Sequence, residues 1–437
     1  MRGGSMGASE LVHVHGPAQV DLDKCVHCGL CLNACPTYRE LGVEMDSPRG
    51  RVYQMVKVAA GEMEPGPSYQ EHIDLCLACR ACETACPSGV PYGRMVEAAR
   101  ADIESRAVRP WYVRAFRSLI FRHLLPSPGA LQFAGTLLYL YEATGLRRLV
   151  QFSDVLSLMG KLGKVESLAP SAEAPFFFRN VGKTFPAEGE QRYRVAFLAG
   201  CIANVCFSRL NEATVRVLQK NGCEVVIPGD QGCCGALHLH SGLKEDAQKL
   251  ARVNIDACVN GKFDAIITNA AGCGSTLKEY HELLEEDTAY REKARLFVSL
   301  MKDVTEFLAS IELNPRMGAV NATATYQDSC HLAHGQKVKV APRRLLAAVP
   351  GLTYREMPFS DICCGSAGIY NVVQNEMAMQ ILDKKMVNVN GTGASLIVTA
   401  NPGCLLQLEA GVKKHGRGQR VAHVVEVLDE AYRNYKE

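Results

Sequence analysis

Two stretches decide the fold of the N-terminal part of the chain: CVHCGLCLNACP at residues 25–36 and CLACRACETACP at residues 76–87. Both have the spacing Cys-x2-Cys-x2-Cys-x3-Cys-Pro, and the second begins 51 residues after the first. Three thiolates at i, i+3 and i+6 of a tight loop can wrap one iron-sulfur cubane, and the fourth, before proline, reaches the other cluster in two-cluster ferredoxins. The pattern therefore predicts two [4Fe-4S] clusters and one-electron transfer.

Each predicted cluster draws its fourth ligand from the other stretch. We expect the first cluster on Cys25, Cys28, Cys31 and Cys86, and the second on Cys76, Cys79, Cys82 and Cys35. Structural zinc is an alternative, although zinc sites usually show two separated ligand pairs. Disulfides would need an oxidising compartment. The start of the chain lacks a secretory leader pattern and the 19 cysteines are an odd number, so we expect reduced thiols in a cytoplasmic protein.

The composition is that of an ordinary globular protein with several domains. The chain has 437 residues, 47% of them hydrophobic, and a formal net charge of +2. This balance predicts no general attraction to nucleic acid or to an anionic bilayer. The most apolar stretch, residues 130–141, is too short to cross a membrane, which needs about 20 residues. Partners must therefore be recognised locally.

The pattern of apolar residues, glycines and prolines predicts four parts: an α-helical ferredoxin domain at residues 16–108, a helical connector and extended linker at 109–190, and two cysteine-rich domains at 191–312 and 318–437. We expect helices over residues 50–60 and 92–106. Arg49 and Arg51 are interpreted as a solvated helix start. The aromatic residues between 111 and 133 are interpreted as a core-facing stripe, with a helix lying on a membrane surface as the alternative.

The C-terminal half repeats itself. Cys330 follows Cys201 by 129 residues, Cys363 follows Cys233 by 130, and Cys404 follows Cys273 by 131. A repeat kept to within two residues indicates an internal duplication. Each copy carries four cysteines that are candidates for a further cluster or redox thiols: Cys201, Cys233, Cys234 and Cys273, and then Cys330, Cys363, Cys364 and Cys404.

Within each copy, strands and helices alternate, which predicts a parallel sheet with right-handed crossovers. The cysteines follow the carboxyl ends of strands, where open α/β sheets assemble ligand sites, so four thiols of a copy can converge. The remaining cysteines, Cys206, Cys223 and Cys258, are expected to be buried apolar residues. Four histidines near the cysteines are expected to be exposed or hydrogen-bonded rather than ligands: His238, His240, His331 and His334. His27, inside the first loop, is a candidate for tuning the first cluster.

Several strings together resemble the family of glycolate oxidase iron-sulfur subunits: CVHCGLC with CPTY, SPRGR, CLACRACETACPSGV, GCCGALHLH, and ICCGSAG with TANPGC. The resemblance implies an α+β multidomain fold, in which an α-helical ferredoxin domain with two [4Fe-4S] clusters precedes two duplicated α/β CCG modules. It also implies an FAD-containing 2-hydroxy-acid dehydrogenase partner and a membrane or quinone acceptor, with a peripheral place on the cytoplasmic face of the membrane. Related subunits that reduce heterodisulfides have a fifth cysteine per module, whereas positions 270 and 401 here are alanine and asparagine.

The chain contains no dinucleotide fingerprint, phosphate-binding loop or nucleophile elbow, so we expect no catalytic residue for substrate oxidation. The preferred hypothesis is an oxidoreductase subunit that conducts electrons for a glycolate or other 2-hydroxy-acid dehydrogenase. The alternative is a CCG-type disulfide or quinone reductase subunit, of the heterodisulfide, lactate or anaerobic glycerol-3-phosphate type. A third hypothesis is a non-redox scaffold with structural metal.

Overall fold

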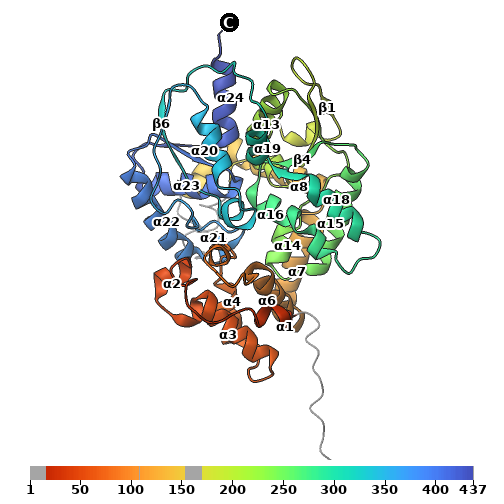
Figure 1. Cartoon of the computed structure of the whole chain (residues 1–437), viewed down its shortest axis with the longest axis vertical. Coiled ribbons are helices and arrows are strands. Elements are labelled where there is room, and N and C mark those ends of the chain that lie inside the picture. The colour runs from red at the N-terminus through yellow and green to blue at the C-terminus, as the bar shows by residue number, and fades with distance from the viewer. Residues whose placement is uncertain (1–15, 108, 153–169, 437) are drawn as a thin grey trace, which may run out of the picture.

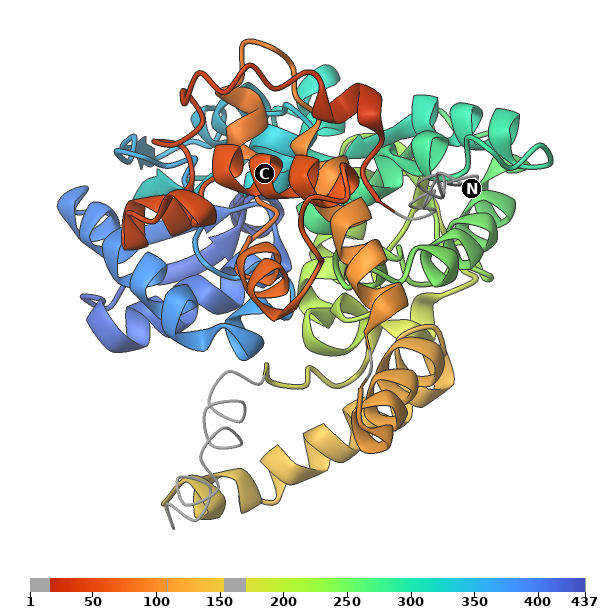
Figure 2. The same cartoon turned by 90° about the horizontal axis from the view of Figure 1, so that it is seen from below.

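The computed structural model describes residues 16–107, 109–152 and 170–436. Two α/β modules lie side by side, and the helical N-terminal domain covers one end of both (Figure 1). Seen from that end, the helices that follow the N-terminal domain form an arm along one side of the molecule (Figure 2). The arrangement brings the N-terminal cysteine loops next to both modules.

The N-terminal domain is built from short helices around a small apolar core. Ser47 caps the longest helix of its first half by accepting a hydrogen bond from the backbone N–H of Gly50, and Pro48 occupies the first turn, as the sequence predicts. Ile73 and Met95 are fully buried between the helices. The helices are α1 (Gln19–Leu22), α2 (Pro36–Leu41), η1 (Glu44–Asp46), α3 (Pro48–Ala59), α4 (Pro67–Asp74), α5 (Ala81–Thr84) and α6 (Tyr92–Arg106).

The arm consists of α7 (Trp111–Ser118), the π-helical turn η2 (Leu119–Leu124), α8 (Pro128–Ala143) and α9 (Leu146–Phe152). The break between η2 and α8 falls at Pro126 and Pro128, as expected, whereas Thr144 and Gly145 separate α8 from α9. Part of the expected helical connector, residues 153–160, lies outside the described residues. No helix of the described chain is both long and apolar enough to cross a bilayer.

The extended linker expected in the second part of residues 109–190 is only partly confirmed. Residues 161–169 lie outside the described part of the chain, but the rest is folded against the first module. Phe177, in η3 (Phe177–Asn180), is fully buried and packs edge-on against Phe197. Strand β1 (Thr184–Phe185) then pairs antiparallel with β3 (Cys223–Val226). Sequence periodicity missed these elements because they are too short to show one.

The first module is a five-stranded sheet with the order β1-β3-β2-β4-β5, parallel except for β1. Its other strands are β2 (Tyr193–Phe197), β4 (Ala265–Thr268) and β5 (Met301–Asp303). The sheet is covered by α12 (Ala203–Cys206), α13 (Ser208–Lys220), α14 (Ala236–His240), α15 (Lys244–Val259), α16 (Ala271–Lys278), α17 (Tyr280–Leu283), α18 (Arg291–Leu300) and α19 (Val304–Ser310). The chain reverses its direction of strand addition between β2 and β4, where open sheets place ligands.

The second module repeats this plan with a four-stranded, all-parallel sheet of order β7-β6-β8-β9. The strands are β6 (Ala322–Tyr326), β7 (Leu352–Tyr354), β8 (Leu396–Thr399) and β9 (Arg420–His423). The helices are η4 (His331–Gly335), α20 (Val340–Ala347), α21 (Tyr370–Val373), α22 (Asn375–Gly391), α23 (Pro402–His415) and α24 (Val424–Asn434). The parallel sheets predicted from the alternating pattern are therefore confirmed, while β5 and β9 were not foreseen.

Candidate metal centres

The two N-terminal cysteine loops share one backbone shape. His27 and Ala78, each just before the second cysteine of its loop, have positive φ angles of 53° and 51°. Gly29 and Arg80, just after that cysteine, have φ angles of 83° and 63°. Left-handed residues reverse the chain sharply and are uncommon outside glycine, so their recurrence at matching positions shows that both loops curl in the same way.

The first loop lines one side of an apolar pocket, and the end of the second loop closes it. The thiols on its wall are Cys25, Cys28, Cys31, Cys82 and Cys86. Burial, with smaller contributions from the nearby Cys25 and Cys86, raises the pKa of Cys31 to about 11. Cys28 is exposed. The four thiols expected for the first cluster thus meet at a pocket near the surface.

A second pocket lies deeper, and its thiols are Cys35, Cys76, Cys79 and Cys82. All four of these side chains are buried. Burial raises the pKa of Cys79 and Cys82 well above that of a free thiol, so they would not ionise without a positive neighbour. Iron would supply that charge, since a coordinating thiol is deprotonated outright. The donor set, four thiols in apolar surroundings, fits a [4Fe-4S] cluster.

The backbone and side chains around the second pocket donate to its sulfurs. The N–H of Ala78 lies 3.3 Å from Cys76 Sγ, and the hydroxyl of Tyr92 lies 3.6 Å from the same sulfur. Hydrogen bonds to ligand sulfur tune the reduction potential of a cluster. No group of three or more His, Cys, Asp or Glu in the described part of the chain is arranged to hold a single metal ion.

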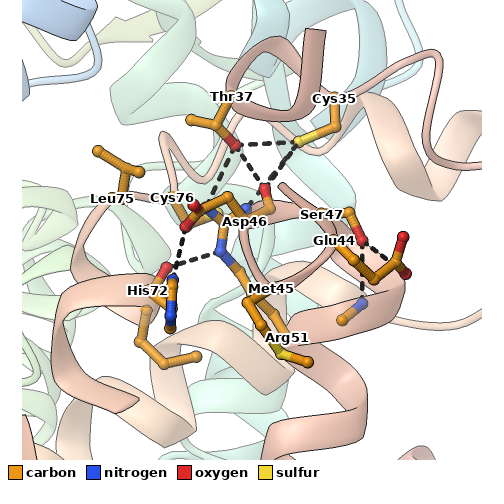
Figure 3. A network of polar contacts seen from close by, with 12 residues as sticks. Cys35, Thr37, Glu44, Met45, Asp46, Ser47, Arg51, His72, Leu75 and Cys76 are labelled. Carbon is orange, nitrogen blue, oxygen red and sulfur yellow. Dashed lines mark hydrogen bonds and ion pairs between the residues drawn. The ribbon is translucent and has the colours of Figure 1, made fainter. Parts of the chain in front are cut away.

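Arg51 is fully buried beside the second pocket, which corrects its interpretation as part of a solvated helix start (Figure 3). Its Nε donates to the carbonyl oxygen of His72 at 2.6 Å, its Nη2 donates to Thr37 Oγ1 at 3.2 Å, and its Nη1 lies 3.9 Å from Cys35 Sγ. Asp46 lies 3.6 Å from the guanidinium and 2.8 Å from the ring of His72. A charge held in this way can offset the negative charge of a thiolate-ligated cluster.

Arg49, by contrast, remains half-exposed near the first loop. Its Nε donates to Glu44 at 2.8 Å, and its Nη1 donates to the carbonyl oxygen of His27 at 3.3 Å. His27 itself is exposed, and a tuning role for its ring stays a prediction. The two arginines of the SPRGR string thus serve different loops. The SPRGR string was part of the family resemblance, but only the folded chain shows that Arg49 is half-exposed and Arg51 is buried.

In the first module, four thiols gather beyond the ends of neighbouring strands. Cys201 Sγ lies 3.6 Å from Cys233 Sγ, and Cys234 contacts both Cys233 and Cys273. Hydrogen bonds from Cys201 and Cys234 lower the pKa of Cys233 well below that of a free thiol. Gly235 adopts φ = 81° directly after Cys233 and Cys234, a backbone conformation that favours glycine, at the point where both thiols join the group.

In the second module the corresponding four thiols also gather. Cys330 contacts Cys363, and Cys364 contacts both Cys363 and Cys404. Asn401, which stands where a fifth cysteine would be, donates from its amide to Cys404 Sγ at 3.5 Å. Its Oδ1 accepts from the backbone N–H of Gly272 at 3.2 Å, so this asparagine joins the two modules.

The two modules differ in their distance from the second pocket. Burial and then the nearby Cys363 raise the pKa of Cys79, and the two cysteines share one buried apolar cluster with Cys330 packed against it. Tyr370 also donates to the carbonyl oxygen of Leu75 at 2.9 Å. The thiols of the second module therefore lie next to the second pocket.

A cavity of about 200 Å³ lies beside the thiols of the first module. Cys201 and Cys233 form part of one wall, and the turn between η2 and α8 forms another through Leu125, Pro128 and Leu131. The cavity therefore joins the arm to the cysteine cluster. Sequence reasoning could not find it, because its walls are 70 residues or more apart in the chain.

All four histidines near the cysteines are hydrogen-bonded, and they bond mostly to the N-terminal domain and the arm. His331 Nε2 lies 3.0 Å from the carbonyl oxygen of Ala78, and His238 Nε2 lies 2.6 Å from that of Phe121. His240 contacts Glu97 at 3.0 Å, and His334 contacts Thr84 at 2.8 Å. The remaining cysteines, Cys206, Cys223 and Cys258, are buried as expected.

Models of known families match segments of the N-terminal domain, the connector and both modules. Residues 21–90 match the 4Fe-4S dicluster domain, and residues 195–278 and 324–409 each match the cysteine-rich domain called CCG. Residues 112–169 match the linker region of the glycolate oxidase iron-sulfur subunit. The cysteine pattern for two [4Fe-4S] clusters thus lies in a domain of the matching kind.

Relatives along the whole chain agree. The chain is 42% identical over 417 residues to the probable glycolate oxidase iron-sulfur subunit of Bacillus subtilis (strain 168), covering 94% of each. It is 33% identical over 422 residues to the glycolate oxidase iron-sulfur subunit of Escherichia coli (strain K12), again covering 94% of each. The lactate utilization protein A of Halalkalibacterium halodurans is 29% identical over 56% of the chain. The chain belongs to the glycolate oxidase iron-sulfur subunit family.

Proposed function

We propose that this chain is the electron-transfer subunit of a glycolate oxidase complex. It takes electrons from an FAD-containing 2-hydroxy-acid dehydrogenase subunit and passes them on towards a membrane or quinone acceptor. The observation that carries the proposal is the pair of pockets that each gather at least four thiols, in a chain related along 94% of its length to such a subunit. A flavin that oxidises a substrate by two electrons and hands them on singly needs a conduit of this kind.

In this proposal Cys25, Cys28, Cys31 and Cys86 hold the first cluster, and Cys76, Cys79, Cys82 and Cys35 hold the second. When bound, the clusters supply one-electron chemistry over a wide range of potentials. The surrounding residues exclude water from the second pocket, and Arg51 balances its negative charge. The domain division follows the function: residues 16–108 for the clusters, 109–190 as connector, and 191–312 and 318–437 as CCG modules.

The two pockets also suggest an order for the electrons. The first pocket reaches the surface at the exposed Cys28, which a partner subunit can approach. The second is buried and adjoins Cys363 of the second module. We propose that electrons enter at the first pocket and continue through the second towards the CCG modules.

The decisive experiment is anaerobic purification of the untagged complex followed by addition of glycolate. We expect an FAD-containing subunit to co-purify and glycolate to bleach the cluster absorption near-completely, with L-lactate and glycerol-3-phosphate as alternative donors. If no flavoprotein co-purifies and separately purified candidates do not reduce the clusters with any of these donors, the assignment fails.

A second candidate function, reduction of a disulfide or quinone at a CCG module, is favoured by one observation. The thiols Cys201 and Cys233 form a wall of the cavity beside the arm, where a small acceptor could reach them. Replacing Cys233 by serine should then abolish acceptor reduction while the N-terminal clusters still accept electrons from the donor. Unchanged turnover in that variant would remove this candidate. Iron and sulfide analysis of the same variant would show whether the module holds a further cluster.

A further inference from the structure

The arm exposes apolar side chains in two regular stripes. In α7 and η2 the stripe is Tyr112, Phe116 and Leu119, and in α8 it is Phe133, Leu137 and Leu140. Both follow the spacing i, i+4, i+7 that places side chains on one face of a helix. Phe116 and Phe133 are 65% and 66% exposed. The expectation of a core-facing aromatic stripe is therefore wrong except for Phe121, which is buried.

The opposite face of α8 shows that the stripe is not simply an uncovered core. Leu131, Gly135 and Leu138 pack on the first module. A methyl group at Gly135 would lie 2.6 Å from Val205 Cγ1, so the helix approaches the module as closely as a glycine permits. Helix α8 therefore has two apolar faces, about 160° apart at 100° per residue. One face anchors the arm, and the other meets solvent.

The charge of the arm points to the kind of surface that covers the second face. Residues 109–150 contain six arginines and one glutamate, a net charge of +5, whereas the rest of the chain has 42 basic and 45 acidic residues, a net charge of −3. Arg114 and Arg148 are exposed and form no ion pair with any described residue. Aromatic residues, leucines and arginines on an amphipathic helix are the composition of helices that lie in a membrane interface.

We propose that the arm docks on an anionic phospholipid bilayer, with its exposed stripes in the interface and the exposed Arg114 and Arg148 attracted by the lipid phosphates. The other four arm arginines form ion pairs with Glu104, Asp246 and Glu142 within the protein. The helices lie on the membrane and do not span it. The inference deepens the proposed function, on which it rests for the membrane acceptor, by naming the surface that meets the membrane.

The chain carries its own probe, because Trp111 is its only tryptophan and lies in α7 with 79% of its surface exposed. The full chain with its clusters is floated with vesicles of phosphatidylglycerol and phosphatidylcholine, and with vesicles of phosphatidylcholine alone. We expect it to float with the anionic vesicles only, with a blue shift of the Trp111 emission that high salt reverses. Neither flotation nor Trp111 emission needs turnover. Failure of the glycolate assignment therefore does not change the membrane result, and failure of membrane binding does not change the glycolate assignment.

Two pairs of variants test the chemistry. Arg114→Glu with Arg148→Glu should weaken binding at least about 20-fold, since each basic charge at an anionic surface contributes about fivefold. Arg316→Glu with Arg417→Glu makes the same charge change at two exposed positions away from the arm, one just before the second module and one within it, and should have little effect. Phe116→Ser with Leu119→Ser should weaken binding about tenfold or more. Val340→Ser with Val387→Ser removes equally exposed apolar groups elsewhere as its control.

The proposal is overturned if the chain stays unbound with anionic vesicles. It is also overturned if Trp111 shifts only on addition of the flavoprotein, which would make the arm a protein-docking surface. A shift that grows with protein concentration in the absence of lipid would instead assign the stripes to a second copy of the chain.

Discussion

The two cysteine loops have the same spacing and the same left-handed turns, yet they lie in different surroundings. In the first loop Cys28 is exposed and Cys25 and Cys31 are half-buried, whereas Cys76, Cys79 and Cys82 of the second loop are all buried. Spacing therefore decides which sulfurs can meet. The packing of the rest of the chain decides how much water and charge surrounds them.

The difference arises because the second loop faces both α/β modules. Its Arg80 pairs with Glu279 of the first module, and Ala78 accepts a hydrogen bond from His331 of the second. The first loop lies at the outer side, where its main polar neighbour is Arg49. Substitutions in and around the two loops, and at matching helix caps of the two modules, test how far such differences in surroundings extend.

The largest effect should follow from replacing the fourth cysteine of each loop, which is expected to bind the cluster of the other loop. Cys35→Ser removes a sulfur from the pocket of the other loop, so it should cost the second cluster, while Cys86→Ser should cost the first. Iron and sulfide content should fall by about half in each, and EPR of Cys35→Ser should resemble that of Cys79→Ser. Cys206→Ser, at a buried thiol outside both pockets, is the control. Resemblance of Cys35→Ser to Cys25→Ser would show that each loop holds its own cluster.

The next effect should be on potential. Arg51→Gln removes the buried positive charge beside Cys35 and should lower the potential of the second cluster by on the order of 100 mV, as one charge a few ångströms away does at an effective dielectric constant of about 20. Arg49→Gln, at the half-exposed arginine near the first loop, should shift either potential much less. Redox titration followed by EPR separates the two clusters. Equal shifts in both variants would mean that burial does not distinguish the two arginines.

The duplicated modules offer the same comparison at two helix caps. Asp303 and His423 begin α19 and α24, each with a glutamate three residues later in a capping box. Burial raises the pKa of Asp303 to about 6 and lowers the pKa of His423 to about 4. Because the unfolded chain takes up the His423 proton first, acidification from pH 7 to 5 should cost about 2 kcal/mol there. Protonation of Asp303 is favoured in the folded chain, so it should increase the free energy of unfolding by about 1 kcal/mol over the same pH range.

Asparagine can cap a helix without titrating, so it separates the two contributions. His423→Asn should flatten the loss of stability between pH 7 and 5, and Asp303→Asn should steepen it. Anaerobic thermal unfolding of the full chain with its clusters across this range is the measurement. Parallel curves for both variants and the unchanged chain would show that neither cap titrates as its burial implies.

The smallest effect should come from the loop backbone. Gly29 has φ = 83°, and a methyl group there would lie 2.7 Å from Arg49 Nη1 and 2.9 Å from Leu32 Cδ1. Gly29→Ala should therefore cost about 1–2 kcal/mol of stability. Gly89→Ala, at φ = 63° with open space around it, should show the backbone cost alone, about 1 kcal/mol. Thermal midpoints that move equally would remove the steric part of the argument.

Much of the fold could be predicted because its signals are local. The helix expected over residues 92–106 has those bounds in the structure, and the one expected over 50–60 runs from 48 to 59. The strand at 265–268 follows from its apolar run. The prediction that the aromatic stripe faces the core was wrong for a physical reason. Periodicity shows which side chains share a face, but not whether anything covers that face. The interpretation of Arg51 as a solvated residue was wrong for a similar reason, because its burial depends on His72 and Asp46, which approach it only in the folded domain.

By itself, the sequence determined the two cysteine spacings, the duplication of the modules and the parallel sheets, because covalent spacing and hydrophobic period act over a few residues. Only the tertiary structure decided that one pocket is open and the other buried, that Cys363 adjoins Cys79, and that the arm turns an apolar face outward. These features join residues tens to hundreds of positions apart, and their energy comes from desolvation, which exists only when the parts have packed together.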